Sequence, residues 1–93
     1  MFTISQGKGF QLTFKNGWTV SVQFGTGNYC ERQNYQAKFE SERNTRRWQS
    51  LTAEIAAWSA SKKWYSFGDD TVKGHVSSDE VALFIDKVRK FKR

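Results

Sequence analysis

Alternation of apolar and polar residues marks two strands near the N-terminus. Phe10, Leu12 and Phe14 alternate with polar residues, and the same alternation runs from Trp18 to Phe24. Asn16-Gly17 separates the two runs, and this dipeptide is typical of the type I′ turn that joins antiparallel strands. The pattern predicts a β-hairpin over 10–24 with one apolar face. Such a hairpin is not stable alone in water, so other elements must cover that face.

Two further strands are expected in the second half of the chain. Residues 51–58 alternate, with Ala53, Ile55 and Ala57 on one side. A polar link at 59–63 leads to 64–67, which reads as the fourth strand and forms a second hairpin with 51–58. The sequence leaves open a short edge strand at Phe2 and Ile4, and a short extended segment at 71–76.

From Ser77 onward the apolar spacing changes to the helical period. Val81, Phe84, Ile85, Val88 and Phe91 fall on one stripe, which predicts a helix over 78–91. Ser77 and Glu80 have the spacing of a capping box at its start. Acidic residues lie in its first turn and basic residues in its last, as the helix dipole favours.

These elements predict one α+β domain over residues 1–93. The domain is a four-stranded antiparallel meander covered on one face by the C-terminal helix, and 93 residues suffice for one modest core. The predicted core residues are Phe10, Leu12, Phe14, Trp18, Val20, Val22, Ile55, Val81, Phe84, Ile85 and Val88.

The net charge of +6 suggests polyanionic partners, but its position has a structural explanation. Residues 86–93 hold five Lys or Arg residues against one Asp. A basic domain attracts nucleic acid, acidic proteins and anionic lipid alike, while cations at a helix C-terminus also stabilise the helix. No apolar run reaches the length of a membrane span, and one cysteine without a signal sequence favours the cytoplasm.

Residues 31–50 follow no regular period and form a long connection in this reading. The connection mixes aromatic residues with arginines, which are typical of protein interfaces and of single-stranded nucleic-acid sites. A solvated loop whose rings pack back onto the core is the third reading. The candidate partner-binding residues are Tyr29, Tyr35, Phe39, Arg43, Arg46, Arg47 and Trp48. The alternative nucleic-acid site would use Arg46, Arg47, Trp48, Lys87, Lys90 and Arg93.

Residues able to support catalysis are few. Asp69 and Asp70 are adjacent and fit a turn better than a metal site, and Cys30 and His75 alone do not make an ordinary zinc site. We therefore expect no enzyme, no metal and no cofactor.

Several segments resemble small uncharacterised bacteriophage proteins. The matching stretches are GWTVSVQFG at 17–25, GNYC at 27–30, AEIAAW at 53–58, WYSF at 64–67, DTVKG at 70–74 and SDEV at 78–81. The resemblance covers most of the chain except 31–50. Those proteins have a glycine in the turn between the third and fourth strands, which 59–63 lacks. The resemblance implies a binding protein that engages and inhibits a host protein machine, for example in anti-defence. The partner would be a host or viral protein, with nucleic-acid or nucleotide binding as the alternative.

Overall fold

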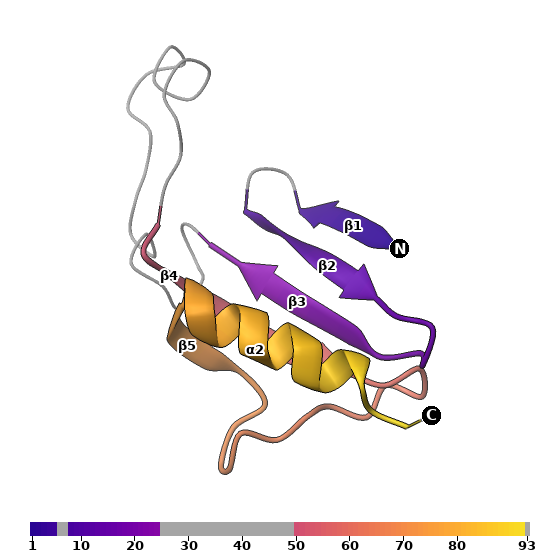
Figure 1. The fold of residues 1–93 in the computed structure, drawn as a ribbon. Coiled ribbons are helices and arrows are strands. Elements are labelled where there is room, and N and C mark those ends of the chain that lie inside the picture. The colour runs from indigo at the N-terminus through magenta and orange to yellow at the C-terminus, as the bar shows by residue number, and fades with distance from the viewer. Residues whose placement is uncertain (6–7, 25–49, 93) are drawn as a thin grey trace.

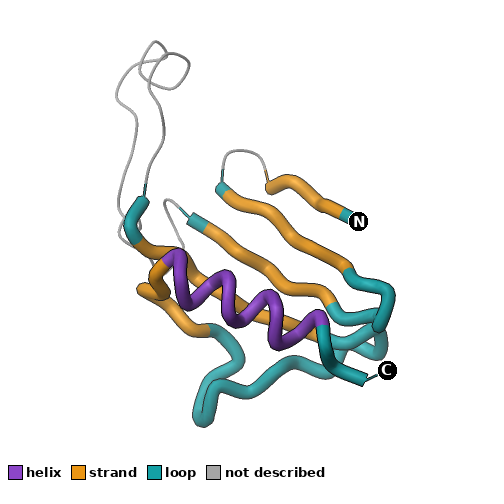
Figure 2. The backbone as a smooth tube through the Cα atoms, in the orientation of Figure 1, coloured by secondary structure: helices purple, strands orange, loops and turns teal. Residues whose placement is uncertain are grey.

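The computed structural model describes residues 1–5, 8–24 and 50–92 of the chain. These residues form an α+β fold in which one helix packs on an antiparallel sheet (Figures 1 and 2). The described strands follow one another in the sheet in chain order, as a meander of five. Their bounds are β1 Phe2–Ser5, β2 Gly9–Thr13, β3 Thr19–Gln23, β4 Thr52–Trp58 and β5 Lys73–Ser77, followed by helix α2 at Ser78–Arg89. The predicted fold class is confirmed, with five strands where the sequence predicts four.

The predicted N-terminal hairpin is confirmed as β2 and β3. Phe10 lies opposite Val22 and Leu12 opposite Val20. The loop differs from the predicted type I′ turn, which requires positive φ at both central residues. Gly17 has a φ of 89°, whereas Asn16 is not among the residues with positive φ. The Phe14 N–H donates to the Trp18 carbonyl at 2.9 Å, so the loop has three residues and ends on a left-handed glycine.

The predicted fourth strand at 64–67 is wrong. Apart from one bridge between Trp58 and Trp64, the segment makes no ladder, and Figure 2 shows it within a long non-regular connection. Its Tyr65 and Phe67 rings pack instead on Phe84 of α2, with centroids 5.3 and 5.2 Å apart. Packing of two half-buried rings beside the helix takes the place of a strand ladder.

Strand β5 holds the sheet position that the sequence assigns to 64–67. It pairs with β4 through Ala53 opposite Val76 and through Ile55 opposite Lys73, with a bulge between these pairs. His75 lies in the bulge with a φ of 54°. The extended segment that the sequence leaves open at 71–76 is thus largely a strand, and β1 is the edge strand left open at Phe2 and Ile4.

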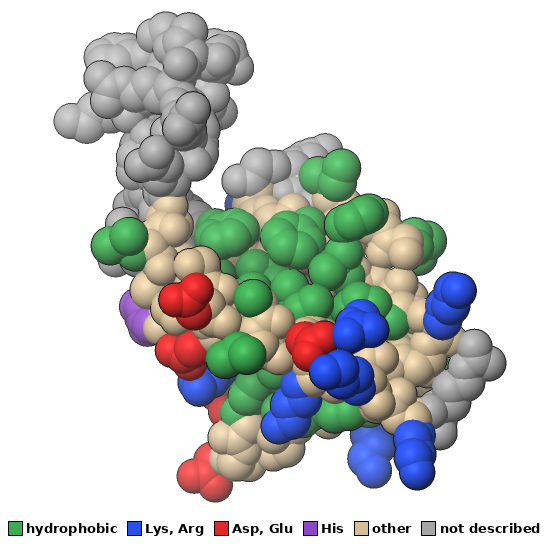
Figure 3. Space-filling view, viewed as in Figure 1, with side chains coloured by type: hydrophobic (Ala, Val, Ile, Leu, Met, Phe, Trp, Pro, Cys, Tyr) green, Lys and Arg blue, Asp and Glu red, His purple; other side chains and the backbone are tan. Residues whose placement is uncertain are grey.

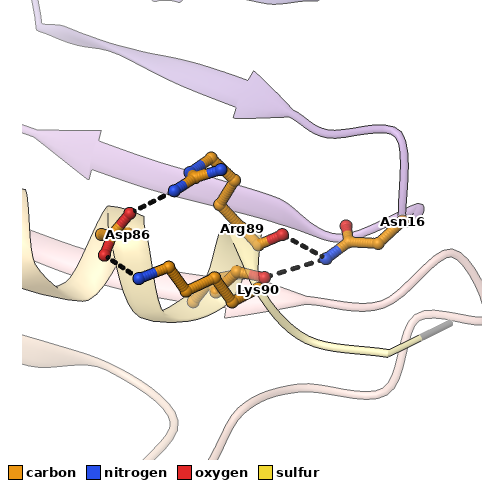
Figure 4. A network of polar contacts seen from close by, with 5 residues as sticks. Asn16, Asp86, Arg89 and Lys90 are labelled. Atoms are coloured by element: carbon orange, nitrogen blue, oxygen red, sulfur yellow. Dashed lines mark hydrogen bonds and ion pairs between the residues drawn. The ribbon is translucent and has the colours of Figure 1, made fainter.

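Helix α2 begins as its sequence predicts. The Ser77 hydroxyl accepts a hydrogen bond from the Glu80 N–H at 3.2 Å, which confirms the cap. The helix ends at Arg89, two residues before the predicted end. Beyond it, the Asn16 side-chain amide of the hairpin loop donates to the carbonyl oxygens of Val88, Arg89 and Phe91. Figure 4 shows Asn16 beside the helix end, with its bond to the Arg89 carbonyl. The loop of the first hairpin therefore caps the C-terminus of the last element.

The core lies between α2 and the strands β3, β4 and β5, which are the strands that the helix contacts most. The buried core residues are Val20, Val22, Ala53, Ile55, Ala57, Val76, Phe84 and Val88. Five of these were predicted, whereas Ala53, Ala57 and Val76 were not. Other predicted members are only half-buried: Phe10, Phe14, Trp18, Val81 and Ile85 pack against the core, and Leu12 is also half-buried. Unpredicted aromatic packing comes from Tyr65 and Phe67.

Candidate partner-binding surface

Most residues of the predicted sites lie outside the described residues. This holds for Tyr29, Tyr35, Phe39, Arg43, Arg46, Arg47, Trp48 and Arg93, and also for Cys30. Of the predicted nucleic-acid residues, the structure describes Lys87 and Lys90, both at the C-terminal end of α2.

Both lysines interact with side chains of this chain. Lys87 Nζ donates to the Tyr65 hydroxyl at 2.9 Å and lies 5.3 Å from the centre of that ring. Lys90 Nζ lies 2.8 Å from Asp86 Oδ2, and Arg89 binds the other oxygen of the same carboxylate at 2.6 Å (Figure 4). Hydrogen bonds from Lys90 and then Arg89 lower the pKa of Asp86. These contacts support the structural explanation of the basic helix end, although both cations stay exposed.

Of the residues considered for catalysis, Asp70 has a role in local structure. The Asp70 carboxylate accepts hydrogen bonds from the Thr71 and Val72 backbone N–H groups at 2.7 and 3.2 Å, which is a turn interaction. His75 is exposed in the β5 bulge. Within the described part of the chain, no three His, Cys, Asp or Glu residues gather as metal ligands.

A different surface stands out on the helix side of β1 and β2. Sheet register places Phe2, Leu12 and Val20 in one row across the sheet, and Ile4, Phe10 and Val22 in the next. Val20 and Val22 are 0% and 1% exposed beneath the helix, whereas Phe2 and Ile4 are 75% and 80% exposed. Figure 3 shows hydrophobic side chains gathered on this face beside α2. We call Phe2, Ile4, Phe10 and Leu12 the apolar strip.

The strip is uncovered because a single helix is narrower than the sheet. Five strands spaced about 4.8 Å apart span about 19 Å, while a helix with its side chains is about 10–12 Å wide. Helix α2 lies over β3, β4 and β5 (Figure 1), so the other two strands extend the same apolar face beyond it. The strip is therefore continuous with the core but faces solvent in the described structure.

A hollow of about 140 Å³ opens at the border between the strip and the start of α2. Phe10, Val22, Phe24, Leu51 and Val81 provide most of its apolar lining. A cavity of about 150 Å³ is large enough to hold benzene, so this hollow matches one aromatic or large aliphatic side chain. Leu51 beside it is 78% exposed. Strip and hollow together provide a flat apolar area with one anchor position, as protein interfaces do.

The opposite face of the sheet has different chemistry. Thr13 and Thr19 pair through their hydroxyl groups at 2.9 Å, and the Gln23 amide donates to the Ser21 hydroxyl at 3.1 Å. These side chains are polar, although Thr19 and Ser21 are each only 8% exposed. The contrast between the two faces of β1 and β2 makes the exposed apolar side the candidate site.

The sequence contained a signal for this surface that the prediction did not use. Phe2 and Ile4 alternate with polar residues in the same manner as Phe10 and Leu12. A fifth strand with its apolar side toward the helix makes the sheet too wide for one helix to cover. The uncovered strip follows from the number of strands relative to one helix and not from any binding motif.

Comparisons of the chain with models of protein families, with curated proteins and with solved structures found no match. No helix in the described residues has the length and apolar character needed to cross a bilayer.

Proposed function

We propose that this protein is a non-enzymatic binding protein whose apolar strip docks on a partner protein. The observation that carries the proposal is the strong exposure of Phe2 and Ile4 in the same rows as fully buried core residues. Contiguous exposed apolar surface on a soluble domain often marks an interaction site. The hollow lined by Phe10 and Val81 adds the pocket that an interface anchor residue fills.

The resemblance to small bacteriophage proteins supports a more specific version of the proposal. The partner would then be a host protein, and binding would inhibit a host machine such as a defence system. A protein with this role needs a rigid surface and no catalytic group. The five-stranded sheet with its capped helix is suited to hold the strip rigid.

A pair of neighbouring substitutions tests the role of the strip. Ile4 and Thr3 are both exposed on β1, but their side chains leave opposite faces of the sheet. We expect Ile4→Lys to abolish capture of a host protein that the wild-type chain captures, and Thr3→Lys to retain it. With the purified partner, loss of one apolar contact of about 1.5–3 kcal/mol raises Kd by about 10- to 150-fold.

Both variants should keep the thermal transition of the wild-type protein because both positions are exposed. The proposal fails if Ile4→Lys binds as the wild type does, or if the two substitutions weaken binding equally.

Nucleic-acid binding is the second candidate, and the position of the basic residues favours it. The loop containing Lys15 lines a hollow together with Ser59, Ala60 and Ser61, next to Lys62. Asn16 attaches this end of the sheet to the C-terminus of α2. Basic side chains therefore gather at one end of the molecule, where Figure 3 shows them. This candidate predicts binding of short single strands that weakens steeply with added salt. Absence of retention at low salt would remove it.

A further inference from the structure

The two edges of the sheet differ in how they are protected against pairing with another strand. Edge strand β5 has a bulge, an exposed Lys73 and an exposed His75 with positive φ. These features interrupt a regular ladder and discourage edge-to-edge contact. Edge strand β1 has the sequence FTIS, with no charged side chain, no proline and a regular register against β2. The β1 edge therefore lacks the protection that β5 has.

Hydrogen bonds at the start of β1 show which backbone groups face the open edge. Met1 N donates to the Thr13 carbonyl at 3.0 Å, and Thr13 N donates to the Met1 carbonyl at 2.9 Å. In an antiparallel ladder such double-bonded pairs alternate with pairs that share no bond. Thr3 is thus bonded to β2, while the N–H and carbonyl groups of Phe2 and Ile4 point away from it. The open edge of β1 therefore presents the backbone N–H and carbonyl groups of two residues, Phe2 and Ile4.

We propose that β1 pairs with β1 of a second copy, antiparallel and about a two-fold axis through Thr3. In this register Phe2 lies opposite Ile4 of the second copy, and the two pairs exchange four backbone hydrogen bonds. Thr3 lies opposite Thr3 of the second copy in a pair that shares no bond.

The chemistry of β1 fits a copy of itself as the occupant. The symmetric register sets Phe beside Ile on the apolar face twice, which gives each exposed ring and each exposed aliphatic chain a cross-strand neighbour. It brings no like-charged side chains together, and the Met1 amine falls opposite Ser5. The product is a ten-stranded sheet in which two apolar strips adjoin. This pairing does not depend on the proposed function, because the apolar strip is present in a single copy and the β1 edge can pair whether or not the strip binds a partner.

Cysteine cross-linking tests the register. Position 3 would be the self-paired position, with Cα atoms about 4.5 Å apart, which is within the range of a disulfide. Position 2 would be separated from its own copy by about 8 Å, which is too far. In a Cys30→Ser background, we expect Thr3→Cys to form a disulfide-linked dimer at least about tenfold faster than Phe2→Cys in a glutathione buffer, because pairing raises the effective concentration of the two thiols.

Sedimentation of the chain with native β1 gives a second readout, with Thr3→Lys as the matched variant. The pairing involves one short strand from each copy, so we expect a dimer whose fraction rises with concentration. Thr3→Lys places two ammonium groups at the axis and should sediment as a monomer. Equal cross-linking rates at positions 2 and 3, or a wild-type chain that is monomeric at every concentration, would overturn the proposal. Partner binding by Thr3→Lys would still test the apolar strip. Failure of β1 pairing and failure of partner binding are therefore distinguishable.

Discussion

Asn16 provides the sharpest test of how the fold is held together. Its side-chain amide donates to the carbonyl oxygens of Val88 and Phe91, both at 2.9 Å, and to that of Arg89 at 3.2 Å. Its oxygen accepts from the Trp18 N–H at 2.9 Å. One side chain thus orders the hairpin loop and binds carbonyl oxygens at the helix end, where the Val88 carbonyl also accepts from the Phe91 N–H at 3.0 Å. Asn16→Ala removes all of the hydrogen bonds that the Asn16 side chain makes.

The expected cost follows from the number of hydrogen bonds lost. An amide group has two hydrogens, so about two bonds to carbonyls are lost together with the bond from Trp18. Each contributes about 0.5–1.5 kcal/mol net, and water can reach part of this surface, so we expect Asn16→Ala to cost about 2 kcal/mol. For a chain of this size that lowers Tm by about 8–16 °C.

Asn16→Asp keeps the shape and changes the sign of the interaction. The oxygen that accepts from Trp18 is retained, but a second oxygen replaces the donor and faces three carbonyls at the negative end of the helix dipole. The folded state then raises the pKa of the introduced carboxyl group. Its charged form destabilises the fold above that raised pKa, and the penalty disappears as pH falls below the unfolded value of about 4.

Thermal and urea unfolding at pH 7 and at acidic pH measure these effects. Gln11→Glu is the matched control, because it makes the same amide-to-acid change on the polar side of β2. We expect Asn16→Asp to be less stable than Asn16→Ala at pH 7 and to recover relative to the wild type on acidification. If Asn16→Ala and Asn16→Asp were both as stable as the control Gln11→Glu, the capping role of Asn16 would be refuted. A pH-independent Asn16→Asp would refute its electrostatic part.

Three further predictions concern the turn, the core and the helix surface. Lys62 has a left-handed φ of 69°, so Lys62→Gly should stabilise the protein by about 1 kcal/mol, whereas Lys63→Gly should not; urea unfolding compares them. Phe84 is 8% exposed and Leu83 73% exposed, so Phe84→Ala should cost about 3–5 kcal/mol and Leu83→Ala less than about 0.5 kcal/mol, and similar costs would contradict the core assignment. The pKa of Asp86 is lowered from its ordinary value of 3.8, so its ionised form contributes stability above that pH, and this stability is lost as pH falls further. The Tm of Asp86→Asn should therefore approach that of the wild type in acid, and a Tm difference that stays constant with pH would contradict this.

Local pattern predicts the parts of this fold that local chemistry decides. The hairpin at 10–24 and the cap at Ser77 are confirmed because alternation, turn residues and side-chain spacing act over a few positions. The role of Asn16 was not predictable in this way, since it depends on where a helix 72 residues later ends. The turn type of the hairpin loop was not predictable from local pattern either, because a tertiary contact at the loop can select it.

The exchange of the fourth strand shows a second limit. Aromatic residues favour strands, and 64–67 has three in four positions, whereas β5 contains Gly74 and His75. The structure assigns the ladder to β5, where Val76 fills a core position at 1% exposure, and assigns Tyr65 and Phe67 to ring packing beside α2. Strand propensity reports how side chains fit a half-buried surface, and here the rings fit the side of the helix.

The width of the sheet relative to one helix links the fold to the proposed function. Strands β3, β4 and β5 with α2 contain the residues that are buried most deeply, so they supply most of the apolar stabilisation. Strand β1 adds backbone pairing but keeps Phe2 and Ile4 exposed, so their side chains add little to folding. Binding residues on this strand can therefore change without unfolding the domain. That separation is why Ile4→Lys and Thr3→Lys can distinguish a binding surface from a poorly covered core.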